Sequence, residues 1–258
     1  MGADHNDAVD YQVQGRVAWV RMNRPDALNA FNGDLRQDLL ASLQQADTDP
    51  QVRVIVLGST GCAFCAGADL MEEKSAGHDV TDELMQEYFP LINTVRTSGK
   101  PVIGVAPGVA AGVGAALLMG CDQVVMAEEA RIYLAFSHIG LVPDGGVTWL
   151  LYQNLGYQRA FELIVEGGSL GADACQRLGI SNQVVAADQL DRVAAEIAGR
   201  LAECSPVAMA EAKKLLRAAA SVSFEDNFAA EARAQKRCIN SDASKEEIAR
   251  FRDKAANK

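Results

Sequence analysis

The chain has 258 residues, a hydrophobic content of 49% and a formal net charge of −10. A chain of this length and composition can bury a large core, which excludes wholesale disorder. Nucleic-acid binders present basic patches to phosphates, and this acidic chain contains no basic run, so DNA and RNA are excluded as expected partners.

Strand and helix patterns alternate along the first 165 residues or so, and helical patterns dominate the rest. The predicted elements are a hairpin over 11–20, a helix over 34–46, a strand over 52–57, a glycine-bearing loop over 58–70, a polar stretch over 71–82 and a helix over 83–96. There follow a strand at 102–106, a glycine-rich turn at 107–114, a helix ending near 120, and strands at 123–127 and 131–136. This alternation predicts an α/β core with parallel strands.

The remaining predicted elements are a helix from Val147 and helices over 157–166, 172–178, 188–203, 206–220, 224–238 and 245–254. Ser244 and Glu247 form a capping-box pattern at the start of the last helix. We divide the chain into a core over residues 1–200 and a helical oligomerisation region over residues 201–258.

Residues 101–121 contain no charge and are long enough to cross a bilayer. Pro101 and Pro107, however, flank a short β-branched run, and a break follows at Pro107-Gly108. A strand, a turn and a small-residue helix explain this segment better, so we expect no membrane span.

Six cysteines are spread over the chain, and its first ten residues are polar and acidic. Without the apolar segment of a signal peptide, we expect a cytoplasmic protein with reduced thiols. Cys62 and Cys65 fit C-x-x-C, but no second pair completes a zinc site, and the histidines at 5, 78 and 138 lack metal-ligand spacing. We expect no metal, and we interpret the two cysteines as structural, with a redox pair as the alternative.

Two glycine-bearing turns, at 58–70 and 107–114, are candidates for binding an anion, because helix N-termini present unpaired N–H groups. Gly112-Val-Gly114 begins like a dinucleotide motif, but Leu117 occupies the place of its last glycine. A Rossmann or P-loop site is therefore disfavoured.

Asp144 is the candidate acid. It lies between apolar residues just before the helix from Val147. It can cap that helix, or it can act as a general base whose pKa an apolar pocket raises. The residues alone leave both roles open.

Several segments together resemble the crotonase (enoyl-CoA hydratase/isomerase) family in order and spacing across residues 10–255: Arg24–Ala30, Phe64–Leu70, Lys100–Gly114, Cys121-Asp122 and Gly140–Gly146. The resemblance implies a crotonase-like spiral of ββα units with a C-terminal helical trimerisation region. It also implies a homotrimer or a dimer of trimers. The implied substrate is an acyl-CoA thioester, with coenzyme A as part of that substrate and no separate cofactor.

The resemblance also implies an oxyanion hole for the thioester carbonyl, formed by the backbone N–H groups of Ala68 and Val113. Two such donors would stabilise an enolate. By motif position the coenzyme A and substrate contacts are Arg24, Ala27, Leu28, Ala66, Asp69, Leu70, Gly114 and Phe136, with Phe251 and Lys254 reaching from the C-terminal helix.

Two departures from the family pattern bear on the reaction. Family hydratases use two glutamates, and here those positions are Ala116 and Phe136, neither of which can transfer a proton. Asp144 lies eight residues after Phe136, where several family isomerases carry their acid, and its surroundings resemble the Δ3,Δ2-enoyl-CoA and ring-1,2-epoxyphenylacetyl-CoA isomerase branch. We therefore expect a double-bond isomerase with Asp144 as acid and base.

Three alternatives stay open. An enoyl-CoA hydratase would need the two missing glutamates. An aryl-CoA dehalogenase would use Asp144 as a nucleophile, but Phe136 stands where that branch carries a tryptophan. A non-catalytic binder of CoA thioesters would share the fold without turnover.

Overall fold

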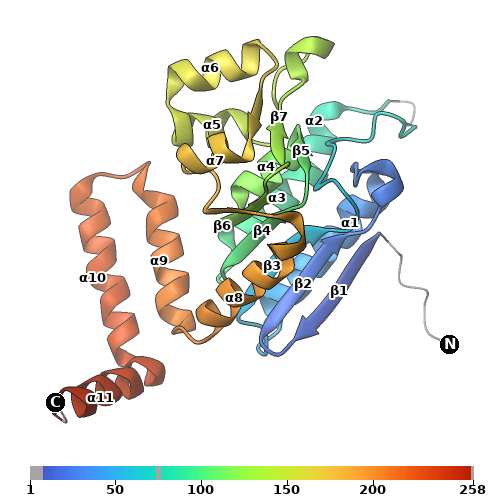
Figure 1. The fold of residues 1–258 in the computed structure, drawn as a ribbon. Coiled ribbons are helices and arrows are strands. Elements are labelled where there is room, and N and C mark those ends of the chain that lie inside the picture. Colours follow the sequence, from blue (N-terminus) through green and yellow to red (C-terminus); the bar gives the residue numbers. More distant parts are fainter. Residues whose placement is uncertain (1–7, 74–76, 257–258) are drawn as a thin grey trace.

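The computed structural model describes residues 8–73 and 77–256, and its core is a six-stranded sheet of order β1-β2-β3-β4-β6-β9 (Figure 1). The strands are β1 (Val9–Gln14), β2 (Val17–Met22), β3 (Val54–Ser59), β4 (Val102–Ala106), β6 (Gln123–Ala127) and β9 (Gln183–Val185). The β1–β2 hairpin is antiparallel, and every other neighbouring pair is parallel. β3 and β4 are buried almost throughout, as expected of parallel strands covered on both faces. The predicted α/β class is confirmed.

Helices cover both faces of this sheet. On one face α1 (Gly33–Thr48) packs against β1, β2 and β3, and α3 (Phe89–Thr97) packs against α1. On the other face, in front of the sheet in Figure 1, α8 (Leu190–Ala202) packs against β2, β3, β4 and β6. Asn32 caps α1 by accepting a hydrogen bond from Leu35 N, and this cap fixes where the chain enters the helix.

A second, three-stranded sheet of order β5-β7-β8 lies beside α4 (Val113–Gly120). Its strands are β5 (Val109–Ala111), β7 (Arg131–Tyr133) and β8 (Ser169–Gly171). The elements around it are the 3-10 turn η3 (Phe136–Ile139) and the helices α5 (Val147–Leu155), α6 (Tyr157–Val165) and α7 (Ala172–Arg177). The predicted strand over 131–136 is thus too long, because η3 begins at Phe136.

The helix predicted over 83–96 is interrupted by a π-helical turn. Its parts are α2 (Val80–Glu83), the π-helical η2 (Leu84–Tyr88) and α3. Pro90 has no N–H to donate to the carbonyl of Gln86, and its ring would crowd that carbonyl in an α-helix. The Phe89 N–H bonds instead to the Leu84 carbonyl, which widens the turn. Two short 3-10 turns complete the described elements, η1 (Pro25–Ala27) and η4 (Ala187–Gln189).

The C-terminal helices α9 (Pro206–Ala219), α10 (Phe224–Asn240) and α11 (Asp242–Ala256) form an arm that extends away from the core (Figure 1). The predicted start of the last helix at 245 is wrong. The helix begins at Asp242, and the Ser241 hydroxyl accepts from Ser244 N at 3.3 Å. Among the described residues, no helix combines the length and apolarity needed to cross a membrane.

Candidate active site

The two glycine-bearing turns predicted from the sequence lie against each other. Ala111 N donates to the Cys65 carbonyl at 2.8 Å, so the loop over 58–70 runs along β5. A Cβ atom built on Gly67 would lie 3.1 Å from the Ala111 carbonyl oxygen. One built on Gly114 would lie 2.7 Å from the Cys65 Cβ, so only glycine allows this approach. The residues that follow Gly67 and Gly112 are thereby neighbours in space.

Ala68 and Val113 each present a backbone N–H without an acceptor among the hydrogen bonds of the described residues. Phe31 bonds to Gly67 O and Asp69 N at 2.8 and 2.9 Å. Since successive residues of an extended segment point to opposite sides, the Ala68 N–H points away from Phe31. Val113 is the first residue of α4, where an N–H has no acceptor within the helix. Two free donors therefore occur at adjacent turns, one of them at a helix N-terminus.

Asp144 lies beside these donors. The backbone of the next residue presses on α4, since a Cβ built on Gly145 would lie 2.8 Å from Val113 Cγ2 and 3.4 Å from Ala116 Cβ. The Asp144 Oδ1 atom is buried and has no hydrogen-bond partner. Burial raises the pKa of Asp144, and repulsion from the Glu83 carboxylate raises it further. Such a carboxyl group holds a proton more readily than an exposed one.

The alternative role of Asp144 as a helix cap is wrong. Gly146 occupies the N-cap position of α5, and no side chain caps this helix. Only the backbone carbonyl of Asp144 takes part, by accepting from Val147 N at 3.0 Å. The carboxyl group is therefore left without a structural role in α5.

Two side chains packed near the second turn carry no ionisable group. Ala116 is fully buried on α4 and faces Gly145. Phe136 is 8% exposed, and its Cζ atom would lie 3.5 Å from a Cβ built on Gly112. Neither a methyl group nor a phenyl ring can transfer a proton, whereas the neighbouring Asp144 carboxyl can.

The segments predicted to hold coenzyme A also meet. Ala66 N donates to the Leu28 carbonyl at 3.0 Å, and both nitrogens of the Arg24 guanidinium lie 3.1 Å from Asp69 Oδ2. Arg24 also donates to the Ala30 carbonyl, so its charge is largely satisfied inside the protein. Ala27 is the last residue of η1. A cavity of about 330 Å³ opens here, lined by Arg24, Asn32, Gly33, Asp34, Asp69, Met71 and Glu72.

Of the remaining residues predicted to contact coenzyme A, two lie on the C-terminal arm and one lies on the exposed loop after Asp69. Leu70 is 79% exposed beside Asp69. Phe251 and Lys254 lie on α11, but their side chains are outside the described residues. Their predicted contact with coenzyme A stays a prediction.

A family model for enoyl-CoA hydratase/isomerase matches residues 12–258, which is nearly the whole chain. The chain belongs to the enoyl-CoA hydratase/isomerase family. A crystal structure of an enoyl-CoA hydratase from Polaromonas sp. JS666 superposes with a TM-score of 0.91 at 30% identity, over 95% of this chain and 97% of the other. A crotonase-like fold is thereby shown.

Some relatives of this family member are named isomerases and others are named hydratases. The chain is 37% identical over 194 residues to 1,2-epoxyphenylacetyl-CoA isomerase of Escherichia coli K12, covering 74% of each chain. It is 33% identical over 220 residues to 2,3-dehydroadipyl-CoA hydratase of the same strain, covering 84% of this chain and 85% of that protein. The family and its acyl-CoA chemistry are therefore established for the chain, and the choice between its reactions depends on the site.

Asn29 connects two loops of this hydratase/isomerase family site, and no signal in the sequence points to this role. Its side chain is fully buried and donates to the carbonyls of Thr60 and Ala63 at 2.9 Å each. Its Oδ1 atom accepts from Arg24 N at 2.8 Å. Asn29 has a φ of 56°, a conformation that asparagine tolerates better than most residues. It thereby ties the loop over 24–30 to the loop over 58–70.

A cluster of charged residues around Arg36 was also missed. The Arg36 side chain is 5% exposed, and it forms ion pairs with Glu72, Glu83 and Glu87. His78 lies in a polar segment, yet its Nε2 atom lies 2.9 Å from Glu83 Oε2. Glu83 and His78 lie five positions apart in a polar segment, and no periodic pattern signals their pairing.

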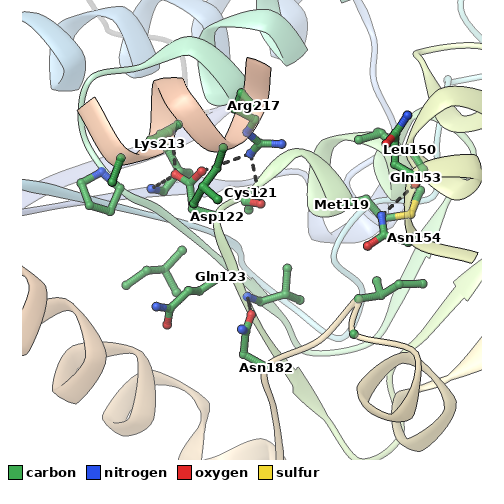
Figure 2. Close-up of a pocket in the computed structure, with 18 of the residues that line it drawn as sticks. Met119, Cys121, Asp122, Gln123, Leu150, Gln153, Asn154, Asn182, Lys213 and Arg217 are labelled. Carbon is green, nitrogen blue, oxygen red and sulfur yellow. Dashed lines mark hydrogen bonds and ion pairs between the residues drawn. The ribbon is translucent and has the colours of Figure 1, made fainter. Parts of the chain in front are cut away.

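A cavity of about 520 Å³ lies away from these residues, between the core sheet and α9 (Figure 2). Several of its polar side chains form ion pairs or hydrogen bonds. Asp122 pairs with Lys213 at 2.7 Å and Arg217 at 3.1 Å, and Asn182 accepts from Val124 N at 2.8 Å (Figure 2). Lys213 and Arg217 also donate to core carbonyls, so this region attaches the arm to the core.

Proposed function

We propose that this member of the enoyl-CoA hydratase/isomerase family moves the double bond of a 3-enoyl-CoA thioester, or of a related ring-containing thioester, with Asp144 as acid and base. The observation that carries the proposal is that the Asp144 carboxyl lies near two residues that cannot ionise. Ala116 and Phe136 occupy the positions where family hydratases would hold glutamates, while the Asp144 carboxyl has a buried and unpartnered oxygen.

In the proposed reaction, the Asp144 carboxylate removes a proton from C2 of the thioester. The electron pair of that C–H bond forms a double bond between C1 and C2, and the carbonyl π pair moves to the thioester oxygen, which gives a dienolate conjugated with the C3–C4 double bond. The N–H groups of Ala68 and Val113 donate to this oxygen, and one such donor contributes about 10²- to 10³-fold to the rate in comparable enzymes. Asp144 then returns the proton to C4, which leaves the double bond between C2 and C3. No water takes part.

Substrate binding is proposed to use the segments that meet beside Arg24. Ala27, Leu28, Ala66, Asp69 and Leu70 would surround the coenzyme A moiety, with Gly114 and Phe136 closer to the thioester. Arg24 donates inward to Asp69 and Ala30. We therefore propose that Arg24 shapes this loop and that backbone groups supply most of the hydrogen bonds to coenzyme A.

The central experiment compares the unmodified protein with Asp144→Asn on a 3-enoyl-CoA, followed by the absorbance of the conjugated product. We expect turnover to fall by at least about 10³-fold, because asparagine cannot exchange a proton. Binding of a saturated acyl-CoA, measured by calorimetry, should stay within a few-fold. Undiminished turnover in the variant would overturn the role of Asp144, and binding without turnover by the unmodified protein would indicate a non-catalytic binder.

Hydration is the second candidate, because 2,3-dehydroadipyl-CoA hydratase is among the relatives. The same protein is therefore assayed for water addition to crotonyl-CoA. We expect a rate far below the isomerisation rate, since the two glutamate positions are vacant. Hydration that is faster than isomerisation would favour this second candidate.

We also propose that the arm mediates assembly into a homotrimer or a dimer of trimers. Leu216, Phe224 and Phe228 are 76%, 78% and 61% exposed on α9 and α10, which is unusual for an isolated surface. Size-exclusion chromatography with light scattering on the full chain tests this. Replacing Phe224 and Phe228 with serine should lower the mass to that of a monomer, whereas a monomeric unmodified protein would contradict the proposal.

A further inference from the structure

Cys65 lies in the seam where the two glycine-bearing turns meet. Its side chain is fully buried, and its carbonyl accepts from Ala111 N at 2.8 Å. Its own N–H donates to the Val109 carbonyl at 3.1 Å. The backbone of Cys65 is therefore fixed on β5, and its side chain lies between the loop over 58–70 and the start of α4.

The Cys65 side chain contacts the backbone next to both proposed donors. On one side, Cys65 Sγ accepts a hydrogen bond from Gly67 N at 3.4 Å, and Ala68 is the next residue. On the other side, a Cβ built on Gly114 would lie 2.7 Å from Cys65 Cβ and 2.8 Å from its Sγ, and Val113 is the residue before it. One side chain therefore packs between the two backbone segments that carry the Ala68 and Val113 N–H groups.

The seam is close-packed along its length. A Cβ built on Gly108 would overlap the Cys62 carbonyl oxygen, and one built on Gly67 would lie 3.1 Å from the Ala111 carbonyl oxygen. These contacts join backbone to backbone, so they change only when a whole turn moves. Cys65 adds a side chain to this row, and a substitution can therefore change its size while the backbone contacts remain.

Cysteine suits this position for two reasons. Its sulfur is a weak hydrogen-bond acceptor on a small apolar side chain, so it accepts from Gly67 N and also packs against Gly114. Burial raises the pKa of Cys65 to about 12, and the Gly67 N–H offsets part of this effect. The thiol is therefore neutral at ordinary pH, so Cys65 adds no negative charge beside the thioester oxygen.

We propose that Cys65 is a positioning residue for the oxyanion hole: its sulfur sets the separation of the Ala68 and Val113 donors. This inference rests on the proposed function, because that function assigns the two N–H groups to the thioester oxygen. Cys65 does not touch the substrate, and it acts through the backbone of Gly67 and Gly114. A donor that moves away from the enolate oxygen forms a longer and weaker hydrogen bond in the transition state.

The test compares Cys65→Ala and Cys65→Ser with the matched control Cys175→Ala in the full chain. Cys175, on α7, is also a free and fully buried thiol, and burial raises its pKa to about 11. Its Sγ donates to the Leu170 carbonyl at 3.5 Å, which belongs to β8 and to neither turn. The control therefore reports what the loss of a buried sulfur elsewhere does to the protein.

Three readouts follow the donors. The first is the infrared stretching frequency of the thioester carbonyl in bound butanoyl-CoA, ¹³C-labelled at C1, because hydrogen bonds to the carbonyl oxygen lower this frequency. The second is the pair of kcat and KM for isomerisation of a 3-enoyl-CoA. The third is the set of amide ¹H–¹⁵N signals of Gly67, Ala68, Val113 and Gly114 in the unliganded protein.

We expect Cys65→Ala to lower kcat by about 10- to 100-fold, with KM within a few-fold of its original value. The bound carbonyl should stretch at a higher frequency, and the amide signals of both turns should shift. Cys65→Ser should recover part of each change, because its hydroxyl accepts from Gly67 N while its shorter bond leaves a gap at Gly114. Cys175→Ala should change stability and leave all three readouts in place.

Equal kcat and equal carbonyl frequency in Cys65→Ala and Cys175→Ala would overturn the inference. If Cys65→Ala does not fold, the same comparison is made with Cys65→Ser. A merely structural role would lower the stability of the Cys65 variants without moving the carbonyl frequency, and this result would also overturn the inference.

The carbonyl frequency separates this inference from the proposed function. If the unmodified protein lowers the frequency but isomerises no 3-enoyl-CoA, the proposed function fails, and the carbonyl and amide readouts still decide the role of Cys65. If isomerisation depends on Asp144 and the frequency ignores Cys65, only the inference fails. An unshifted carbonyl in the unmodified protein would overturn both.

Discussion

Two regions of the molecule near the site are held in place by different forces. On the turn side, formed by residues 64–70 and 109–114, backbone groups and the buried Asn29 amide fix most of the chain, with one ion pair between Arg24 and Asp69. On the acidic side, formed by Arg36, Glu72, His78, Glu83 and Glu87, ion pairs do so. The comparison teaches that the shape of the turn side depends mainly on backbone hydrogen bonds, whereas the acidic side depends on ion pairs around one buried guanidinium.

Arg36→Met should produce the largest effect, because it removes a buried cation that pairs with three carboxylates. Breaking a buried ion pair by removing one partner typically costs about 3–5 kcal/mol of the free energy of unfolding. Urea denaturation measures this. The control is Arg192→Met, which breaks an exposed pair with Glu196 and should cost about 1 kcal/mol or less.

If the Arg36 and Arg192 variants lose equal stability, the acidic side is no more than a solvated surface. The contrast between the two sides would then disappear.

Val113→Pro tests the turn side, because it deletes one donor and leaves the helix intact. Val113 is the first residue of α4, where proline is accepted since the N–H has no partner in the helix. We expect kcat to fall about 10²- to 10³-fold with the circular dichroism spectrum unchanged. Val113→Ala, which keeps the N–H, is the matched control and should retain most of the activity. Full activity in the proline variant would exclude this N–H as a donor.

Asn29→Ala should destabilise the turn side without changing any charge. It removes three hydrogen bonds at a buried site and places alanine at a positive φ. We expect the free energy of unfolding to fall by about 2–3 kcal/mol, equally at pH 5 and pH 8. Asn154→Ala, which removes one bond from an exposed side chain, is the control. A loss that varies strongly with pH would contradict the proposed division between the two sides.

Asp144→Asn should give the smallest change in stability, and in the opposite direction. Because the pKa of Asp144 is raised in the folded state, the fold binds this proton more tightly than the unfolded chain does. The free energy of unfolding therefore falls as pH rises from the pKa of an unfolded aspartate, about 3.9, through the higher pKa of the folded state. At pH 7.5 the full cost of holding the ionised carboxylate in the fold is present. The variant should raise Tm by at most about 3 °C at pH 7.5 and leave it unchanged near pH 4. Glu129→Gln, in an exposed turn, is the control. A lower Tm for the Asp144 variant would contradict a raised pKa of Asp144 in the folded state.

Much of the core could be predicted because its signals are local. The β1–β2 hairpin, β3, β4 and α1 each have enough residues to show alternation, an apolar run or helical spacing. By contrast β5, β8 and β9 have three residues each, too few for a period to show. β5 lies inside the glycine-rich turn, where the small residues indicated a loop.

The two glycine-bearing turns could be predicted from the sequence, and the ion pairs could not. Runs of glycine mark the turns at 58–70 and 107–114 locally, whereas the assignment of Ala68 and Val113 as donors comes from the family resemblance and stays a prediction. The pairing of His78 with Glu83, or of Arg24 with Asp69, depends on how separate segments fold together. Charged side chains in polar segments look alike in a sequence whether they point to water or to one another.

The π-helical turn at Leu84–Tyr88 has a consequence for how this site can change. A π-turn holds one residue more than an α-turn, and each residue of a helix adds about 100° of rotation and 1.5 Å of rise. Deleting one residue from this turn would therefore rotate Glu83 by about a quarter of a circle relative to α3. The position of Glu83 relative to Arg36 is thus encoded in chain length as well as in side-chain chemistry, so one deletion can break this ion pair while every charged residue remains.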